Sequence, residues 1–178
     1  MRRPFLWAVA LAILASTLEC FAEEAPPSAP KPEAKLEFVY LEFTGVEATE
    51  TAAVAKATGE VAGVRSFAWT VQGTEAKVVR EVGKAGDSSL IQSAVSAGAT
   101  TARTIPLAAT TFIFKTKLHC GGCVKAVNQA LRAIKGVKES TVPAELTSVI
   151  AVYDTRLVKV ADIEAALAAI GKPANPAP

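Results

Sequence analysis

The amino-acid sequence predicts an α+β protein built from two tandem copies of one βαββαβ unit. Three observations support this prediction: alternating apolar residues typical of half-buried strands, apolar residues at helical spacing, and a self-similarity at an offset of about 73 residues. The offset runs without gaps from the first strand to the last helix, which indicates a tandem duplication. It aligns Val39, Leu41 and Phe43 with Phe112, Phe114 and Thr116, Ala53-Val54 with Ala126-Val127, Gly63-Val64 with Gly136-Val137, and Gly98 with Gly171.

The chain begins with a predicted signal peptide, residues 1–22. Two arginines precede an apolar stretch of about 14 residues, which is shorter than the roughly 20 needed to span a bilayer. Cleavage after Ala22 would export the protein to the periplasm or outside the cell and leave no membrane span; an uncleaved anchor is the alternative. A lipoprotein signal is disfavoured because Glu19 precedes Cys20, where a small residue is needed. Residues 23–35 follow as a proline-rich, semi-rigid tether.

Each copy repeats the same order of elements. In the N-terminal copy, residues 36–106, we expect strands at 39–43, 64–71, 77–82 and 100–105 and helices at 49–61 and 87–97. In the C-terminal copy, residues 107–178, we expect a first strand with Phe112 and Phe114, hairpin strands at 137–142 and 148–153, and helices at 122–135 and 159–170.

Glycine and proline mark the ends of several of these elements. Gly63 and Gly136 are expected to end the first helices. Prolines after residue 172 should leave the last edge strand of the C-terminal copy short or absent. The resulting order is that of the ferredoxin-like fold, in which two helices pack on one face of an antiparallel sheet.

Composition restricts the function. The formal net charge of the full chain is only +2, with acidic and basic residues interspersed, so neither nucleic acid nor a membrane surface is an expected partner. Once Cys20 leaves with the signal peptide, Cys120 and Cys123 are the remaining cysteines, which excludes a disulfide framework. The sequence contains no recognisable nucleophile–base pair or phosphate-binding loop, and we therefore expect a protein without enzymatic activity.

The chemistry is expected in the segment Lys117-Leu118-His119-Cys120-Gly121-Gly122-Cys123, between a predicted strand and a predicted helix. Two cysteines at i and i+3 point to the same side of a first helical turn, and the helix N-terminus favours their thiolate forms. Gly121 and Gly122 are expected to allow positive φ and the close approach of an ion.

Three interpretations of the cysteine pair remain open at this point. Two thiolates without a third strong ligand suit Cu(I), and also Hg(II) or Ag(I), whereas structural Zn(II) prefers four ligands. An oxidising compartment also allows thiol–disulfide exchange as a redox module. The third interpretation is a protein-interaction domain with a vestigial C-x-x-C.

Residues 109–173 resemble a heavy-metal-associated domain, the module of copper chaperones, copper-ATPase repeats and periplasmic mercury-binding proteins. The family motif Met-x-Cys-x-x-Cys, followed after the helix by Gly-Val, corresponds here to Leu118 through Cys123 and to Gly136-Val137. The resemblance implies that Cys120 and Cys123 bind the metal. The delivery partner would then be a metal transporter or another metal-binding protein.

The resemblance also assigns roles to residues around the cysteines. It implies that Leu118, in the place of the family methionine, packs beneath the loop. Lys172 stands where copper chaperones often carry a lysine that offsets the charge of a bis-thiolate centre; the alternative is an ordinary cation beyond a helix end. His119 either contacts the metal or, as is usual in the family, faces solvent.

The N-terminal copy has Glu47 and Glu50 at the cysteine positions. Carboxylates bind soft metals poorly, so this copy is expected to be a degenerate module that serves as a spacer, docking surface or stabiliser. A hard-ion site at the two carboxylates is the alternative. Phe67, Trp69 and Tyr153 lie on predicted strands and are expected to contribute to packing.

Overall fold

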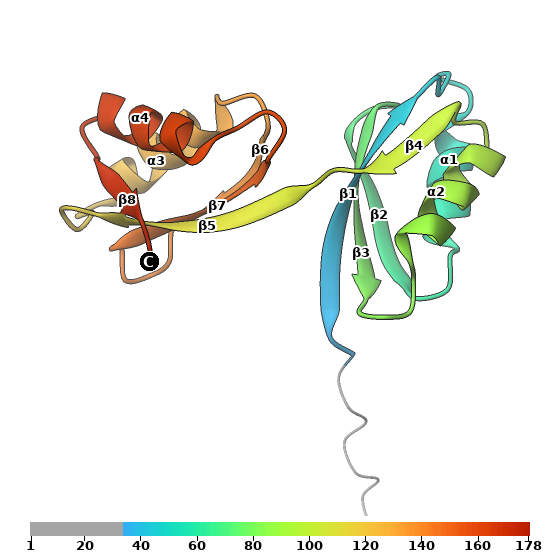
Figure 1. Cartoon of the computed structure of the whole chain (residues 1–178), viewed down its shortest axis with the longest axis horizontal. Helices are drawn as coiled ribbons and strands as arrows, with labels where there is room; N and C mark the ends of the chain where they lie inside the picture. The colour runs from blue at the N-terminus through green and yellow to red at the C-terminus, as the bar shows by residue number, and fades with distance from the viewer. Residues whose placement is uncertain (1–33) are drawn as a thin grey trace, which may run out of the picture. The chain divides into compact units, whose positions relative to one another are not determined.

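The computed structural model of the chain describes residues 34–178 (Figure 1). The predicted signal peptide, residues 1–22, and nearly all of the predicted tether lie outside the described residues. None of the helices in the described part of the chain is long and apolar enough to cross a membrane.

The N-terminal copy is a four-stranded antiparallel sheet in the order β2-β3-β1-β4. Helices α1 and α2 cover one face of this sheet (Figure 1). Phe43 lies in the core of this copy. The ring centroids of Phe67 and Trp69 lie 6.4 and 5.1 Å from the centroid of its ring. The elements are β1 (Leu36–Thr44), α1 (Thr51–Gly59), β2 (Val64–Val71), β3 (Glu75–Glu81), α2 (Asp87–Ser96) and β4 (Thr101–Thr104).

The C-terminal copy has the same topology, with strand order β6-β7-β5-β8. Its last strand has three residues, as expected for a segment rich in proline. The predicted fold class, two tandem ferredoxin-like units, is therefore confirmed. The elements are β5 (Leu107–Phe114), α3 (Gly121–Arg132), β6 (Val137–Thr141), β7 (Ser148–Asp154), α4 (Val160–Ala169) and β8 (Ala174–Pro176).

The core of the C-terminal copy lies between its sheet and the two helices. Helix α3 buries Val127 and Leu131, and α4 buries Ile163 and Leu167, each pair one turn apart. The backbone N–H of Lys159 donates to Asp162 Oδ2 at 2.8 Å, which satisfies an otherwise unpaired donor where α4 begins. Tyr153 is also in this core and 4% exposed.

The gapless offset expected from the sequence is wrong for the first strand. The N–H of Phe43 donates to Thr74 O, and the N–H of Phe114 donates to Thr147 O, both at 2.9 Å. The first strands therefore match at an offset of 71 residues (from 43 to 114), while the third strands match at 73 (from 74 to 147). The first helices also match at 73, because Val54 and Val127 are both fully buried. The C-terminal copy consequently carries two additional residues between its first strand and first helix.

The glycine after each first helix has a different role from the expected helix end. Helix α3 ends at Arg132, and Gly136 lies in the turn that leads into β6, with φ +107°. Its carbonyl accepts a hydrogen bond from the N–H of Asp154 at 2.9 Å. Gly63 has φ +94° at the equivalent place, and its carbonyl accepts from the N–H of Glu81. Each glycine thus fixes the start of the hairpin.

Gly136→Ala is expected to destabilise the C-terminal copy. A Cβ at residue 136 would lie 2.8 Å from Val158 Cγ2 and 2.9 Å from Leu157 Cβ, in addition to the left-handed strain of about 1–2 kcal/mol. Gly171→Ala is the matched control, because Gly171 has φ +70° but open space around its Cβ position. In chemical denaturation, a smaller loss of unfolding free energy for Gly136→Ala than for Gly171→Ala would contradict the proposed clash.

Candidate metal centre

The loop between β5 and α3, residues 115–120, is fixed at both of its sides. The N–H of Leu118 donates to Leu146 O at 2.8 Å, which ties the loop to the turn between β6 and β7. The N–H of Lys115 donates to Pro173 O at 3.0 Å, which ties it to the segment before β8. The Leu118 side chain is fully buried in the core beneath the loop. The backbone that presents the cysteines is therefore anchored by an apolar side chain and two hydrogen bonds.

Cys120 and Cys123 lie at the start of α3 with their sulfur atoms together. Cys120 is the N-cap residue in extended conformation, and Cys123 lies in the first turn, where its N–H donates to Cys120 O at 3.0 Å. The two Sγ atoms are 3.2 Å apart. Both thiols are free, and Cys120 is exposed whereas Cys123 is partly exposed. An ion arriving from solvent can therefore reach both sulfurs.

The environment of Cys123 favours its thiolate. A hydrogen bond with the Cys120 thiol and a backbone hydrogen bond at His119 hold the pKa of Cys123 below its usual range, and partial burial opposes them. The positive charge of Lys172 contributes in the same direction. Lys172 follows Gly171 in the turn after α4, where its N–H donates to Leu167 O at 2.9 Å. The lysine therefore acts on the sulfur through its charge.

Lys172→Met is expected to raise the pKa of Cys123 towards the ordinary thiol range. The methionine keeps the length of the side chain and removes the cation that favours the thiolate. The pH dependence of thiol alkylation measures the change, and its midpoint should move to higher pH. Lys117→Met is the control, because Lys117 is an exposed lysine on the same loop that does not lower the pKa of Cys123. Equal midpoints for the two variants would contradict a specific role for Lys172.

Gly121 and Gly122 do not adopt the positive φ that the sequence would allow at these positions. They are the first two residues of α3 and are absent from the left-handed glycines of the described chain. A Cβ at residue 121 would meet nothing within 4 Å, and one at 122 would meet only Cys120 Sγ, at 3.7 Å. What the two glycines provide is therefore open space beside the sulfurs.

His119 is exposed and does not complete a larger ligand set. Within residues 34–178, no group of three or more His, Cys, Asp or Glu side chains is placed to hold a metal ion. The structure thus brings together the sulfur atoms of two predicted site residues, Cys120 and Cys123. It gives no hard-ion cluster at Glu47 and Glu50 either.

Glu47 and Glu50 occupy the positions that correspond to the cysteines. The N–H of Glu50 donates to Glu47 O at 2.9 Å, the counterpart of the hydrogen bond between Cys123 and Cys120. The Glu50 carboxylate accepts a hydrogen bond from the N–H of Glu47 at 3.1 Å, and lies against Gly98. The Glu50 carboxylate is therefore engaged in a hydrogen bond within the turn that precedes α1.

Sequence analysis did not identify Leu146 as a residue that supports the cysteine loop. The carbonyl that receives the Leu118 N–H belongs to Leu146, which has a positive φ of 59° despite its side chain. Sequence signals for this conformation normally involve glycine, asparagine or aspartate, so a leucine gives none. The role of the turn at Leu146 follows only from the backbone hydrogen bond that it forms with Leu118.

The fold and the paired thiols define a metal-binding type of domain. Residues 112–173 match the family model described as the heavy-metal-associated domain. The function of the protein is therefore related to metal binding or metal transport. No curated protein matches the chain.

Three solved structures are similar to the chain. The N-terminal soluble domains of Bacillus subtilis CopA are 16% identical, with 81% of this chain and 95% of that chain covered and a TM-score of 0.40. Oxidized MerP from Ralstonia metallidurans CH34 is 20% identical, with 41% and 100% covered and a TM-score of 0.39. The CopZ metallochaperone is 28% identical, with 38% and 98% covered and a TM-score of 0.36.

Proposed function

We propose that this protein binds one soft metal ion, with Cu(I) as the preferred ion, between the thiolates of Cys120 and Cys123. The observation that carries the proposal is the pair of accessible sulfurs, 3.2 Å apart at the start of α3. Cu(I) is satisfied by few, soft ligands, which a pair of thiolates provides; Hg(II) and Ag(I) are suited for the same reason. Zn(II) prefers a fuller ligand set.

The open site supports transfer rather than permanent storage. An ion held by two thiolates on an exposed loop can be approached by the thiolates of a second protein, so a metal transporter or another metal-binding protein is the expected partner. Exposed lysines lie within five residues of the cysteines in the sequence, which favours a partner with an acidic contact surface. In this role the protein is a non-enzymatic carrier, exported by the signal-like segment at residues 1–22. The exposed lysines near the cysteines are Lys115, Lys117 and Lys125.

Thiol–disulfide exchange is the second candidate function. The same short distance between the two sulfurs favours it, because little movement separates this pair from a disulfide with its S–S bond of about 2.05 Å. An oxidised pair has no thiolates to offer a metal. The two functions therefore exclude one another in any single molecule at a given time.

Intact mass spectrometry with thiol counting distinguishes the two functions. Reduced protein should retain one Cu(I) per chain against a competing chelator, and protein oxidised in air should retain none until a reductant restores both thiols. A reduced protein with two free thiols that fails to retain Cu(I) would overturn the metal-carrier proposal. Disulfide exchange with a model dithiol under those conditions would then favour the redox module.

A further inference from the structure

The N-terminal copy has a sheet face that carries charged residues and a buried tyrosine. Leu41 and Phe43 of β1 point into the core, so Tyr40 and Glu42 point to the opposite face, away from the helices. Across the sheet, Tyr40 pairs with Lys77 and Glu42 pairs with Glu75. These residues, Tyr40, Glu42, Glu75 and Lys77, are called the docking face below.

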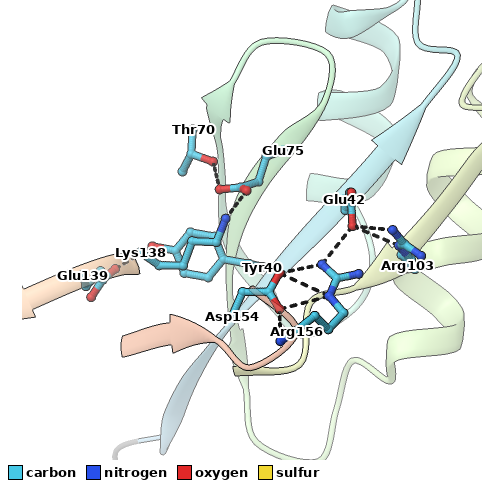
Figure 2. Close-up of polar contacts among 9 residues, drawn as sticks. All are labelled: Tyr40, Glu42, Thr70, Glu75, Arg103, Lys138, Glu139, Asp154 and Arg156. Atoms are coloured by element: carbon cyan, nitrogen blue, oxygen red, sulfur yellow. Dashed lines mark hydrogen bonds and ion pairs between the residues drawn. The ribbon is translucent and has the colours of Figure 1, made fainter. Parts of the chain in front are cut away.

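Tyr40 is only 3% exposed although it does not belong to the core of its own copy. Its hydroxyl donates to Glu139 Oε1 of the C-terminal copy at 2.8 Å (Figure 2). Burial, together with this hydrogen bond and the charge of Glu139, raises the pKa of Tyr40 well above its usual range. A buried tyrosine whose hydroxyl reaches a partner is typical of an interface rather than of a free sheet surface.

Two ion pairs near Tyr40 join the copies, and each copy supplies the acid of one pair and the base of the other. On β6, Lys138 pairs with Glu75 and Glu139 pairs with Lys77, so each copy contributes one acid and one base. The side chains of Glu75 and Lys138 are only 17% and 12% exposed. Reversing the charge of one residue in either pair would place like charges together, so the arrangement specifies which surfaces meet.

A third ion pair lies at the end of β7. Arg156 Nη2 is 3.0 Å from Glu42 Oε2, and the same carboxylate pairs with Arg103 of β4 (Figure 2). Arg156 is itself held by the buried Asp154, at 2.6 Å. The guanidinium is therefore fixed on its own copy before it meets Glu42, which lowers the entropy cost of the contact.

The duplication shows that these charges are specific to the N-terminal copy. In the matched register, the C-terminal copy pairs Thr111 with Ile150 and Ile113 with Ser148, where the docking face pairs Tyr40 with Lys77 and Glu42 with Glu75. Ile113 and Ile150 are 46% and 37% exposed. The two faces thus share a fold and differ in chemistry.

The residues of the C-terminal copy that contact the docking face, Lys138, Glu139 and Arg156, lie at the end of its sheet away from the cysteines. Leu107 at the start of β5 pairs with Asp154 at the end of β7, and the metal loop follows the other end of β5. Because the strands are antiparallel, Arg156 and the cysteine loop lie at opposite ends of the sheet.

We propose that the N-terminal copy is a docking domain, whose sheet face binds the β6 edge and the Asp154–Arg156 turn of the metal-binding copy in the same chain. The two copies then move as one body, and the metal loop stays open to a partner. This inference concerns the role of the copy that has lost the cysteines and does not depend on which metal is bound.

Charge reversal tests the docking in the full chain. Glu139→Lys places two cations together at Lys77 and removes the acceptor of the Tyr40 hydroxyl, so the two copies should separate. In amide ¹⁵N relaxation measurements, wild type should show one rotational correlation time for both copies, and Glu139→Lys should show two different, shorter values. The double variant Lys77→Glu/Glu139→Lys should restore a single value, because it restores the pair in reversed order.

Matched controls make each outcome decisive. Lys117→Glu also reverses a charge but lies outside the interface, and should keep the wild-type correlation time. Well-dispersed amide spectra for both copies establish that each variant is folded. Independent motion of the copies in wild type, or a single unchanged correlation time in Glu139→Lys, would overturn the proposal. A dimeric mass for wild type that is lost in Glu139→Lys would also overturn it, because the docking would then join two chains. Cu(I) stoichiometry of one in every variant keeps this result separate from the proposed function.

Discussion

Cys120→Ser and Cys123→Ser are each expected to lower the affinity for Cu(I) by more than about 100-fold. Even residues that only hydrogen-bond to metal ligands typically contribute 10–100-fold, so loss of one of two ligands should exceed that range. A serine hydroxyl is a poor, hard ligand for a soft ion. The measurement is a competition titration of reduced protein against a Cu(I) chelator.

His119→Ala is the matched control for the cysteine variants. His119 is exposed, and the described residues place no third ligand with the two sulfurs, so its removal should change the affinity less than about threefold. An affinity loss as large as that of a cysteine variant would show that the imidazole is a ligand, and the two-thiolate site would be wrong.

The fold was accessible from the sequence because each element buries a regular apolar pattern. Leu41 and Phe43 alternate in β1, and Val127 and Leu131 recur at helical spacing in α3. The register of the first strand was not accessible. Side chains in a strand alternate with period two, so offsets of 71 and 73 residues place the same apolar residues inward. The backbone hydrogen bonds and the pairing register of the strands distinguish the two offsets.

The two cysteines could be identified from their spacing in the sequence. The contacts that hold the cysteine loop and the two copies in place could not, because they join segments that are distant in the sequence. The turn at Leu146 and the inter-copy partners of Tyr40 follow no periodic pattern in the sequence. The positive φ that glycine permits at Gly121 and Gly122 is not adopted, because α3 begins at Gly121 and both residues belong to the helix. Glycine permits many conformations, and the helix selected an ordinary one.

The double substitution Glu47→Cys/Glu50→Cys is expected to raise the Cu(I) stoichiometry from one towards two per chain. The hydrogen bond from Glu50 to Glu47 O repeats the one from Cys123 to Cys120 O, so the new thiols would lie close to the start of α1, with residue 50 as its N-cap. The new site should be the weaker one. Its loop is two residues shorter, and the buried Ala99 takes the place of Lys172.

Native mass spectrometry of the reduced protein measures the number of ions directly. Ala48→Cys/Thr51→Cys, shifted by one residue, is the control; Thr51 is buried, so this variant should remain at one ion per chain. A wild-type protein that takes up two ions, and loses the second on Glu47→Ala, would make the N-terminal copy a metal site in its own right. A wild-type stoichiometry of one, with two only in Glu47→Cys/Glu50→Cys, would establish that the N-terminal copy retains the fold of a metal-binding domain while its carboxylates prevent soft-metal binding.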